Sequence, residues 1–198
     1  QPLSFSVSET TEGVHIHIID AELMGKGEKE KKDLYIEGVQ NNGIINHYEY
    51  IINSEGTIEI RHVLKPEGKM PLWFPRIGLT LTVSDALDQV KWYGRGPQEN
   101  YPDRKTGYPT GIYASTVQAM YEPYLMPQDY GLRTDVRWLQ LTTDKGIGLQ
   151  FKMNEWFNFN IYPYSTDNLT KAMYTYQLQK QKGMTLNLDY ATTGVGCT

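Results

Sequence analysis

The stretch Arg76-Ile77-Gly78-Leu79-Thr80-Leu81-Thr82-Val83 alternates apolar side chains with small or polar ones almost without interruption. Successive side chains of a β-strand point to opposite faces of the sheet, so this spacing predicts a strand with one buried face and one exposed face. The same alternation recurs at residues 14–18, 57–61, 157–162 and 184–190. Further strands are expected at residues 3–7, 34–39, 45–53, 87–93, 136–141 and 147–152.

Turn-forming residues separate these expected strands. Asn41-Asn42-Gly43, Ser54-Glu55-Gly56 and Asp144-Lys145-Gly146 each supply a residue that adopts positive φ at little cost. The last two predict hairpin connections. Helical periodicity is nearly absent, and the best candidate is a short helix at residues 166–173, capped by Thr166 or Asp167.

Strand spacing also indicates the architecture. Many strands at intervals of roughly 10 residues predict an antiparallel sandwich or barrel. Because two-faced alternation recurs along the whole chain, we favour an all-β fold of two large antiparallel sheets, stacked about 10 Å apart. The 198 residues contain no internal repeat and no clear linker, so one domain over residues 1–198 is expected.

Composition excludes several classes of protein. The net charge of −4, from 19 basic and 23 acidic residues, argues against a nucleic-acid partner. No apolar run approaches the length of a membrane span, and the first residues lack the pattern of a signal peptide. The single cysteine, Cys197, cannot form an internal disulfide, so cysteine content does not indicate whether the protein is cytoplasmic or periplasmic or secreted.

The run Trp92-Tyr93-Gly94-Arg95-Gly96-Pro97-Gln98-Glu99-Asn100-Tyr101-Pro102-Asp103-Arg104 combines aromatic, carboxylate, amide and guanidinium groups. Such groups can hold a sugar, or they can lock a long loop onto a sheet. Residues 94–132 are expected to be irregular, and a connection of that length is usually functional or packed onto the domain. Residues 25–33 carry mixed charges and are expected to form a solvated surface loop. The candidate substrate-rim or loop-bracing residues are Trp92, Tyr93, Arg95, Glu99, Asn100, Tyr101, Asp103 and Arg104.

Two acids of this run could in principle form a catalytic pair. Glycoside hydrolysis needs two carboxyl groups roughly 5 to 10 Å apart across the bond. Glu99 and Asp103 fit that requirement in kind, but Arg95 and Arg104 are near enough in sequence to pair with them. Paired carboxylates are usually held ionised, so we favour loop bracing over sugar contact, and sugar contact over catalysis.

Metal and nucleophile chemistry find little support in the sequence. His15 and His17 share one face of a strand, as two metal ligands would, but no neighbouring residue completes a set of three or four. No metal site is therefore expected. His47 and His62 have no recognisable partner, and the chain lacks a nucleophile elbow and a phosphate-binding glycine loop.

The run at residues 92–104 resembles the Gly-Pro-x-Glu-Asn-Tyr-x-Asp-Arg motif of the bacterial β-galactosidases of glycoside hydrolase family 2, in their C-terminal small-chain domain. Further motifs follow the family's order, and the similarity is strongest from about residue 72 onward. They are Pro75-Arg76-Ile77-Gly78-Leu79, Pro123-Tyr124-Leu125-Met126-Pro127-Gln128-Asp129-Tyr130-Gly131-Leu132-Arg133, Leu186-Asn187-Leu188-Asp189-Tyr190 and Gly194-Val195-Gly196.

The resemblance implies a galactose-mutarotase-like supersandwich without catalytic residues of its own. In the family, both catalytic glutamates lie in an upstream barrel domain, which commonly also holds Mg²⁺ and Na⁺; no cofactor is expected in this chain. The parent would hydrolyse terminal β-D-galactosides with retention. The family's rim aromatic follows a Gly-x-Gly-Gly-x-x-x-Trp motif, from which residues 194–198 depart. We therefore expect a domain truncated at its C-terminal end.

Three functional classes follow from these observations. The first is a non-catalytic β-galactosidase domain that shapes a wall of the active site and stabilises the assembly. Its partners would be a β-galactoside or other carbohydrate, the remaining domains of the polypeptide and, as an open option, identical subunits. The second is an independent carbohydrate-binding module, which would stack sugars on Trp92, Tyr93, Tyr101 or Trp156. The third, a sugar-epimerising enzyme, ranks last because no histidine follows His62.

Overall fold

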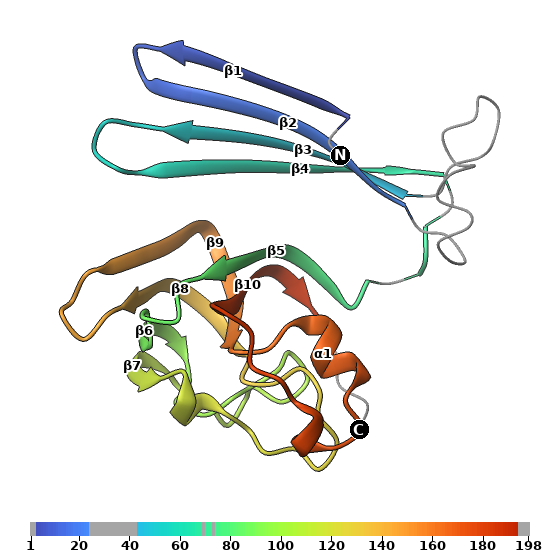
Figure 1. Ribbon diagram of the computed structural model, residues 1–198, viewed down its shortest axis with the longest axis vertical. Coiled ribbons are helices and arrows are strands. Elements are labelled where there is room, and N and C mark those ends of the chain that lie inside the picture. The colour runs from blue at the N-terminus through green and yellow to red at the C-terminus, as the bar shows by residue number, and fades with distance from the viewer. Residues whose placement is uncertain (1–2, 24–42, 69, 73, 194–198) are drawn as a thin grey trace. The chain divides into compact units, whose positions relative to one another are not determined.

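The computed structural model describes residues 3–23, 43–68, 70–72 and 74–193. Its contacts divide the chain into two compact units, Gln1–Leu72 and Trp73–Thr198. Each unit is built on one antiparallel sheet, which confirms the predicted all-β fold class with two antiparallel sheets (Figure 1). The prediction of a single domain over residues 1–198 stays a prediction. No helix among the described residues is long and apolar enough to cross a membrane.

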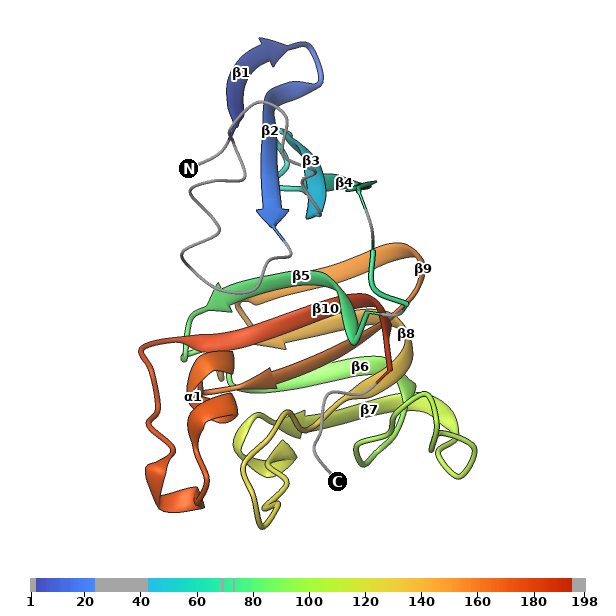
Figure 2. The same cartoon turned by 90° about the vertical axis from the view of Figure 1, so that its right-hand side faces the viewer.

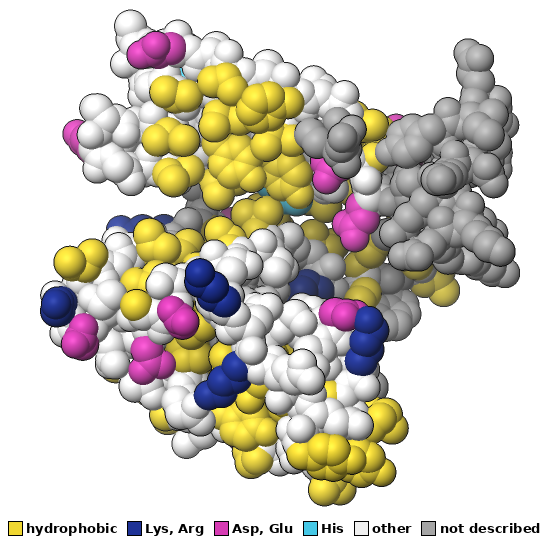
Figure 3. All heavy atoms as spheres, in the orientation of Figure 1, with side chains coloured by type: hydrophobic (Ala, Val, Ile, Leu, Met, Phe, Trp, Pro, Cys, Tyr) yellow, Lys and Arg dark blue, Asp and Glu magenta, His cyan; other side chains and the backbone are white. Residues whose placement is uncertain are grey.

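The first unit is a four-stranded meander in the order β1-β2-β3-β4. The strands are β1 (Ser4–Thr10), β2 (Gly13–Leu23), β3 (Gly43–Ile52) and β4 (Ile58–Glu67). The predicted turn at Ser54-Glu55-Gly56 joins β3 to β4, and Gly56 has a φ of 83°. Hydrophobic side chains gather over this sheet, and Phe5, Val7 and Ile58 are more than half exposed (Figure 3). The strand expected at residues 34–39 and the charged loop at 25–33 lie outside the described residues.

The second unit is a six-stranded sheet in the order β5-β10-β9-β8-β6-β7, which Figure 2 shows strand after strand. Its strands are β5 (Arg76–Val83), β6 (Gln89–Arg95), β7 (Thr110–Thr116), β8 (Arg133–Thr142), β9 (Gly148–Tyr162) and β10 (Met184–Thr192). Three short helices complete it: η1 (Gln118–Met120), α1 (Thr166–Lys171) and η2 (Thr175–Gln177). The predicted turn at Asp144-Lys145-Gly146 joins β8 to β9.

Alternation buries one face of the larger sheet in an apolar core. Trp92, Leu139, Phe159 and Leu186 are at most 1% exposed and belong to one cluster. Across the β9–β10 ladder, Phe159 lies opposite Leu188, so the same face stays apolar from strand to strand. A second cluster, rich in tyrosine, contains Tyr130, Tyr162 and Leu169, the buried residue of α1. The apolar face of the sheet follows directly from the period of two along each strand.

Three local predictions were wrong. Residues 94–132 are not wholly irregular, because they contain β7, an edge strand that pairs with β6 alone and exposes Ile112. The runs at 147–152 and 157–162 are one strand, β9, whose residues 153–156 interrupt the alternation. The helix is capped by Ser165, whose hydroxyl accepts from the Asn168 N–H at 3.1 Å, and not by Thr166 or Asp167.

Because leucines in the core and on the surface differ in burial, the same Leu→Ala change should cost very different amounts of stability at two positions. Leu139 is fully buried, whereas Leu125 is 96% exposed. Leu139→Ala should lower the free energy of unfolding by about 2 to 5 kcal/mol, because it removes buried methyl groups and leaves a cavity. Leu125→Ala should stay within about 0.5 kcal/mol of wild type. Urea denaturation monitored by tryptophan fluorescence measures both, and equal losses would contradict the burial assigned to β8.

Candidate functional site

Trp92 and Tyr93 are neighbours on β6 and therefore point to opposite faces of the sheet. Trp92 is 1% exposed. Its Nε1 donates to the Arg95 carbonyl at 3.0 Å, and its ring meets Phe159 edge-on. Tyr93 is half-buried, and its ring centroid lies 4.8 Å from the Arg137 guanidinium carbon. Trp92 is thus a core residue with no face open to a ligand.

Glu99 is 5% exposed, and its carboxylate accepts three hydrogen bonds. Oε1 accepts from Arg104 Nη2 and from the Tyr124 hydroxyl, and Oε2 accepts from the Gly131 N–H at 2.7 Å. These donors lie at three separate points of the segment between β6 and β8. Burial, followed by the hydrogen bond to Glu99, raises the pKa of Tyr124 to about 12, so the phenol remains a donor at neutral pH. One carboxylate thereby holds this segment together.

Asn100 and Tyr101 continue the same anchoring. Asn100 is fully buried; its Oδ1 accepts from the Thr134 N–H at 3.1 Å and from the Thr134 hydroxyl, and its Nδ2 donates to the Gln98 carbonyl. The Tyr101 ring is 9% exposed and lies under the Arg104 guanidinium, 5.0 Å from it. Burial raises the pKa of Tyr101. Both side chains are buried, so neither offers a surface that a sugar could contact.

Arg95 pairs with an acid outside the 92–104 run. Its Nε donates to Asp135 Oδ2, and its Nη1 donates to the carbonyls of Lys105 and Tyr108 at 3.1 and 2.9 Å. Lys105 Nζ donates to Asp135 Oδ1 at 2.9 Å. Burial favours the neutral acid, but the hydrogen bonds from Arg95 and Lys105 outweigh it and lower the pKa of Asp135. Asp135 is therefore held as a carboxylate.

Two further charged residues, Asp103 and Arg133, lie in or beside this segment. Asp103 is exposed and makes no ion pair with any residue that the structure describes. Arg133 is 3% exposed, its guanidinium carbon lies 5.3 Å from the Trp92 ring, and its Nη1 donates to the Gly131 carbonyl at 2.9 Å. Burial lowers the pKa of Arg133 to about 10. The two acids of the run thus occupy different environments, one buried and braced, the other in water.

A buried charged group lies on the polar face of the same sheet. Arg76 contacts both Asp129, at 3.1 Å, and Asp189, at 3.0 Å. Asp129 also accepts from Asn160 Nδ2 and the Tyr162 hydroxyl. Neither oxygen of Asp189 accepts a well-aligned hydrogen bond from the described residues. Burial, which the Asp129 charge reinforces and Arg76 opposes, raises the pKa of Asp189 to about 7.

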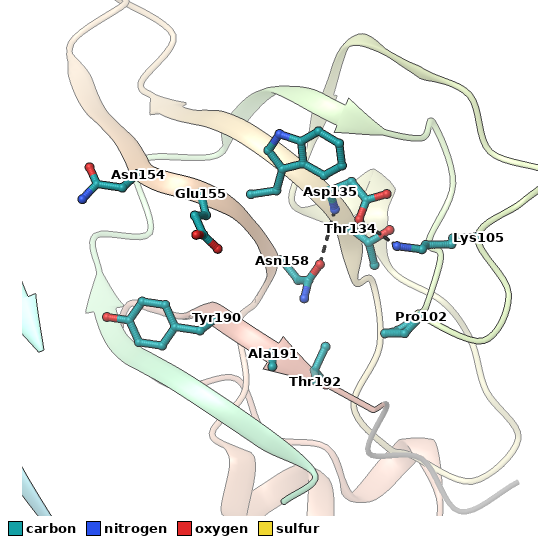
Figure 4. Close-up of a pocket in the computed structure, with 11 residues that line it drawn as sticks. Pro102, Lys105, Thr134, Asp135, Asn154, Glu155, Asn158, Tyr190, Ala191 and Thr192 are labelled. Atoms are coloured by element: carbon teal, nitrogen blue, oxygen red, sulfur yellow. Dashed lines mark hydrogen bonds and ion pairs between the residues drawn. The ribbon is translucent and has the colours of Figure 1, made fainter. Parts of the chain in front are cut away.

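Three irregularities of strand pairing meet at one surface hollow of about 650 Å³ (Figure 4). The β8–β9 register shifts between Arg133 and Val136 and again between Val136 and Trp138, and the β5–β10 register shifts at Tyr190. Several residues that fall outside the regular ladders line the hollow. They are Thr134 and Asp135 from β8, Asn154, Glu155 and Trp156 from β9, and Tyr190 from β10. Bulges of this kind often re-aim side chains beside functional sites.

Trp156 and Tyr190 supply the aromatic surface of this hollow. Trp156 is 60% exposed, and the Arg137 guanidinium carbon lies 4.4 Å from its ring centroid. Because Arg137 also covers the Tyr93 ring, the three side chains form a stack that fixes the indole. Asn158 Oδ1 accepts from the Asp135 N–H at 3.4 Å, which links β9 to the positive-φ residue of β8 (Figure 4). An indole beside carboxylate and amide groups can contact a sugar.

The first unit contains one group with the composition of a metal site. Among the described residues, the ligand atoms of His15, His17 and Glu49 lie within 4.8 Å of one another. The sequence places the two histidines on one strand but does not reveal Glu49, which lies opposite His17 across the β2–β3 ladder. Only the pairing of strands brings this third residue to the histidines.

The structure separates the candidates that the sequence singles out. Glu99, Asn100, Tyr101 and Arg104 lie together in the anchored loop, whereas Trp92 lies in the core and Tyr93 on the opposite face. Sequence reasoning missed the hollow and its residues Asp135, Asn154, Glu155, Asn158 and Tyr190. A signal for part of it was present, because the apolar alternation breaks at residues 153–156 between two regular runs.

Fold and site together define an all-β protein with a loop-braced sheet and a polar surface hollow. The family described as "Beta galactosidase small chain" matches residues 6–198. A β-galactosidase of Priestia megaterium is 38% identical over 147 residues, 74% of this chain, and one of Vibrio cholerae is 39% identical over 122 residues, 62% of it. The chain belongs to the β-galactosidase small-chain family. It spans only 14% and 11% of those two relatives.

Because Glu99 braces the loop and Asp103 does not, substitution of Glu99 should destabilise the protein more than substitution of Asp103. Glu99→Gln keeps the side-chain shape but removes the charge opposite Arg104. It also replaces one acceptor oxygen with an NH₂ group that has no good acceptor nearby. We expect the free energy of unfolding to fall by about 1 to 3 kcal/mol. The matched change Asp103→Asn, at an exposed site, should alter it by less than about 0.5 kcal/mol. Denaturant titration of both variants measures the difference, and a greater loss in Asp103→Asn would refute the bracing.

Asp189 predicts a pH dependence of stability. Its pKa is raised to about 7 by burial, against about 3.9 in an unfolded chain, so the folded state holds the proton longer. Stability from this group is present below about pH 4 and is lost as pH rises through about 7. Relative to Asp189→Asn, wild type should therefore lose up to about 4 kcal/mol over that window.

The measurement is the free energy of unfolding of wild type and Asp189→Asn at several pH values between these limits. Asp85→Asn, at an exposed position, serves as the matched control and should run parallel to wild type. Parallel curves for Asp189→Asn as well would show that Asp189 does not titrate with a raised pKa.

Proposed function

We propose that this chain is a non-catalytic part of a β-galactosidase that hydrolyses terminal β-D-galactosides, where it shapes one wall of the active site and stabilises the assembly. The observation that carries the proposal is the environment of Glu99. An acid catalyst in glycoside hydrolysis must release and regain a proton beside the glycosidic oxygen. Glu99 instead accepts from Arg104, Tyr124 and the Gly131 N–H inside the protein.

Two other acids near the loop support the same role. Asp103 is exposed, and Asp135 is paired with both Arg95 and Lys105, which keeps it ionised. A glycosidase needs one carboxyl group that stays protonated and one that does not, positioned across a shared bond. The segment between β6 and β8 is therefore suited to hold a rigid surface against other parts of a longer polypeptide.

In a β-galactosidase polypeptide that carries this chain, Glu99→Gln should lower thermal stability or assembly more than it lowers the chemical step. We expect a clear fall in melting temperature, with kcat of the folded fraction within about tenfold of wild type. The measurement combines thermal unfolding with steady-state kinetics on an aryl β-galactoside. A variant that stays fully folded but loses turnover by several orders of magnitude would overturn the non-catalytic role.

The hollow at Trp156 favours a second candidate, an independent carbohydrate-binding module. Trp156 presents an exposed indole beside Glu155, Asn154 and Asn158, which offer acceptors and donors to sugar hydroxyls. Aromatic faces with a few convergent polar groups are typical of small-molecule sites. In this alternative the chain binds sugar without the rest of a β-galactosidase.

Titration of the 198-residue chain with galactose and with lactose separates the two candidates. The structural role predicts no saturable change in tryptophan fluorescence or heat. Saturable binding in the millimolar range or tighter, abolished by Trp156→Ala and retained by Tyr174→Ala, would favour the binding module. Tyr174 is a suitable control because it is similarly exposed, at 57%, and does not line the hollow.

A further inference from the structure

His15, His17 and Glu49 form a compact cluster on one face of the four-stranded sheet. His15 and His17 are two residues apart on β2, so both imidazoles project from the same face. Glu49 lies directly opposite His17 on β3, and opposite residues of neighbouring strands have Cβ atoms about 4.5 to 5.5 Å apart. His15 is the diagonal neighbour. The three side chains therefore converge because of strand register, with no loop involved.

The distances within the cluster fit a bound ion better than direct hydrogen bonds. Glu49 Oε1 lies 3.6 Å from His15 Nδ1 and 3.8 Å from His17 Nε2. Both distances exceed the 2.7 to 3.2 Å typical of N–H···O hydrogen bonds. Zinc bonds of about 2.1 Å at tetrahedral angles place neighbouring ligand atoms about 3.4 Å apart. The three ligand atoms lie within 4.8 Å of one another, and an inward shift of the side chains would reach the tetrahedral spacing.

Glu49 is also oriented for such a role. Its second oxygen, Oε2, accepts from Arg61 Nη1 at 3.1 Å, which leaves Oε1 facing the two imidazoles. Arg61 is itself turned by Glu59, whose Oε1 accepts from Arg61 Nε at 2.8 Å. Outer partners that hold a ligating carboxylate in one orientation are typical of metal sites. The side chains of His15, His17 and Glu49 are 14%, 51% and 25% exposed, so an ion can reach them.

The geometry points to a divalent transition-metal site, with Zn²⁺ as its preferred ion, formed by His15 Nδ1, His17 Nε2 and Glu49 Oε1. Two imidazoles and one carboxylate are a ligand set that zinc uses, with a fourth position open to water. Mg²⁺ and Ca²⁺ prefer sets of oxygen ligands, so they should not compete. A bound ion would link β2 to β3 and fix their register, which stabilises the folded state by mass action.

The test titrates ZnCl₂ into the 198-residue chain by isothermal calorimetry at pH 7.5, with Cys197→Ser in every sample so that a thiolate cannot contribute. We expect one saturable site. His15→Gln, His17→Gln and Glu49→Gln should each weaken binding at least about tenfold, since loss of a residue that merely hydrogen-bonds to a ligand already costs about 10- to 100-fold. His47→Gln is the matched control, because His47 shares β3 and the face of Glu49 but lies outside the cluster.

Two further measurements distinguish a loss of metal binding from misfolding of the variants. Zn²⁺ should raise the melting temperature of wild type and of His47→Gln but not that of His17→Gln. Co²⁺ should give the visible absorption of a tetrahedral nitrogen and oxygen site in wild type, and lose it in each ligand variant. Absence of saturable Zn²⁺ binding, binding unchanged in His17→Gln, or equal loss in His47→Gln would overturn the proposal.

Discussion

The buried carboxylate of Glu99 is the constraint on which the larger unit depends. A charged group at 5% exposure is tolerated only when donors replace the water it has lost. Arg104, Tyr124 and the Gly131 N–H supply them, and together they draw a long segment back onto the sheet. Asn100 then bonds Thr134 at the start of β8. The loop is rigid because leaving the buried Glu99 carboxylate or the buried Asn100 side chain unpaired would be costly.

Departures from regular strand pairing create the surface hollow. A regular ladder would send Glu155 and Trp156 to alternate faces and hold them close to β8. The shifts in the β8–β9 pairing free this part of β9, while the extra residue Tyr190 does the same for β10. Asp135 adopts a φ of 55°, a conformation that Asp tolerates better than most residues. The same sheet therefore provides both a closed apolar core and an open polar site.

Membership of the β-galactosidase small-chain family fits a sheet that has both a closed apolar core and an open polar site. The residues that carried the resemblance, at 92–104, lie mainly in the core or in the braced loop. Trp156, an exposed aromatic residue that could touch a ligand, lies some 50 residues further along the chain. The His15, His17 and Glu49 cluster lies in the other unit, so sugar contact and metal binding can be tested separately.

The all-β class, most strand positions and both hairpin turns could be predicted from local sequence patterns, because period-two alternation and turn residues act over a few neighbouring residues. These patterns missed β7, since an edge strand with one partner needs no clean alternation, and they split β9 where the register shifts. The pairing of Arg95 with Asp135, the approach of Glu49 to His15 and His17, and the position of the hollow are set by how the strands pack. Those contacts depend on which strands are neighbours and in which register, and residues far apart in the chain carry no local pattern that records it.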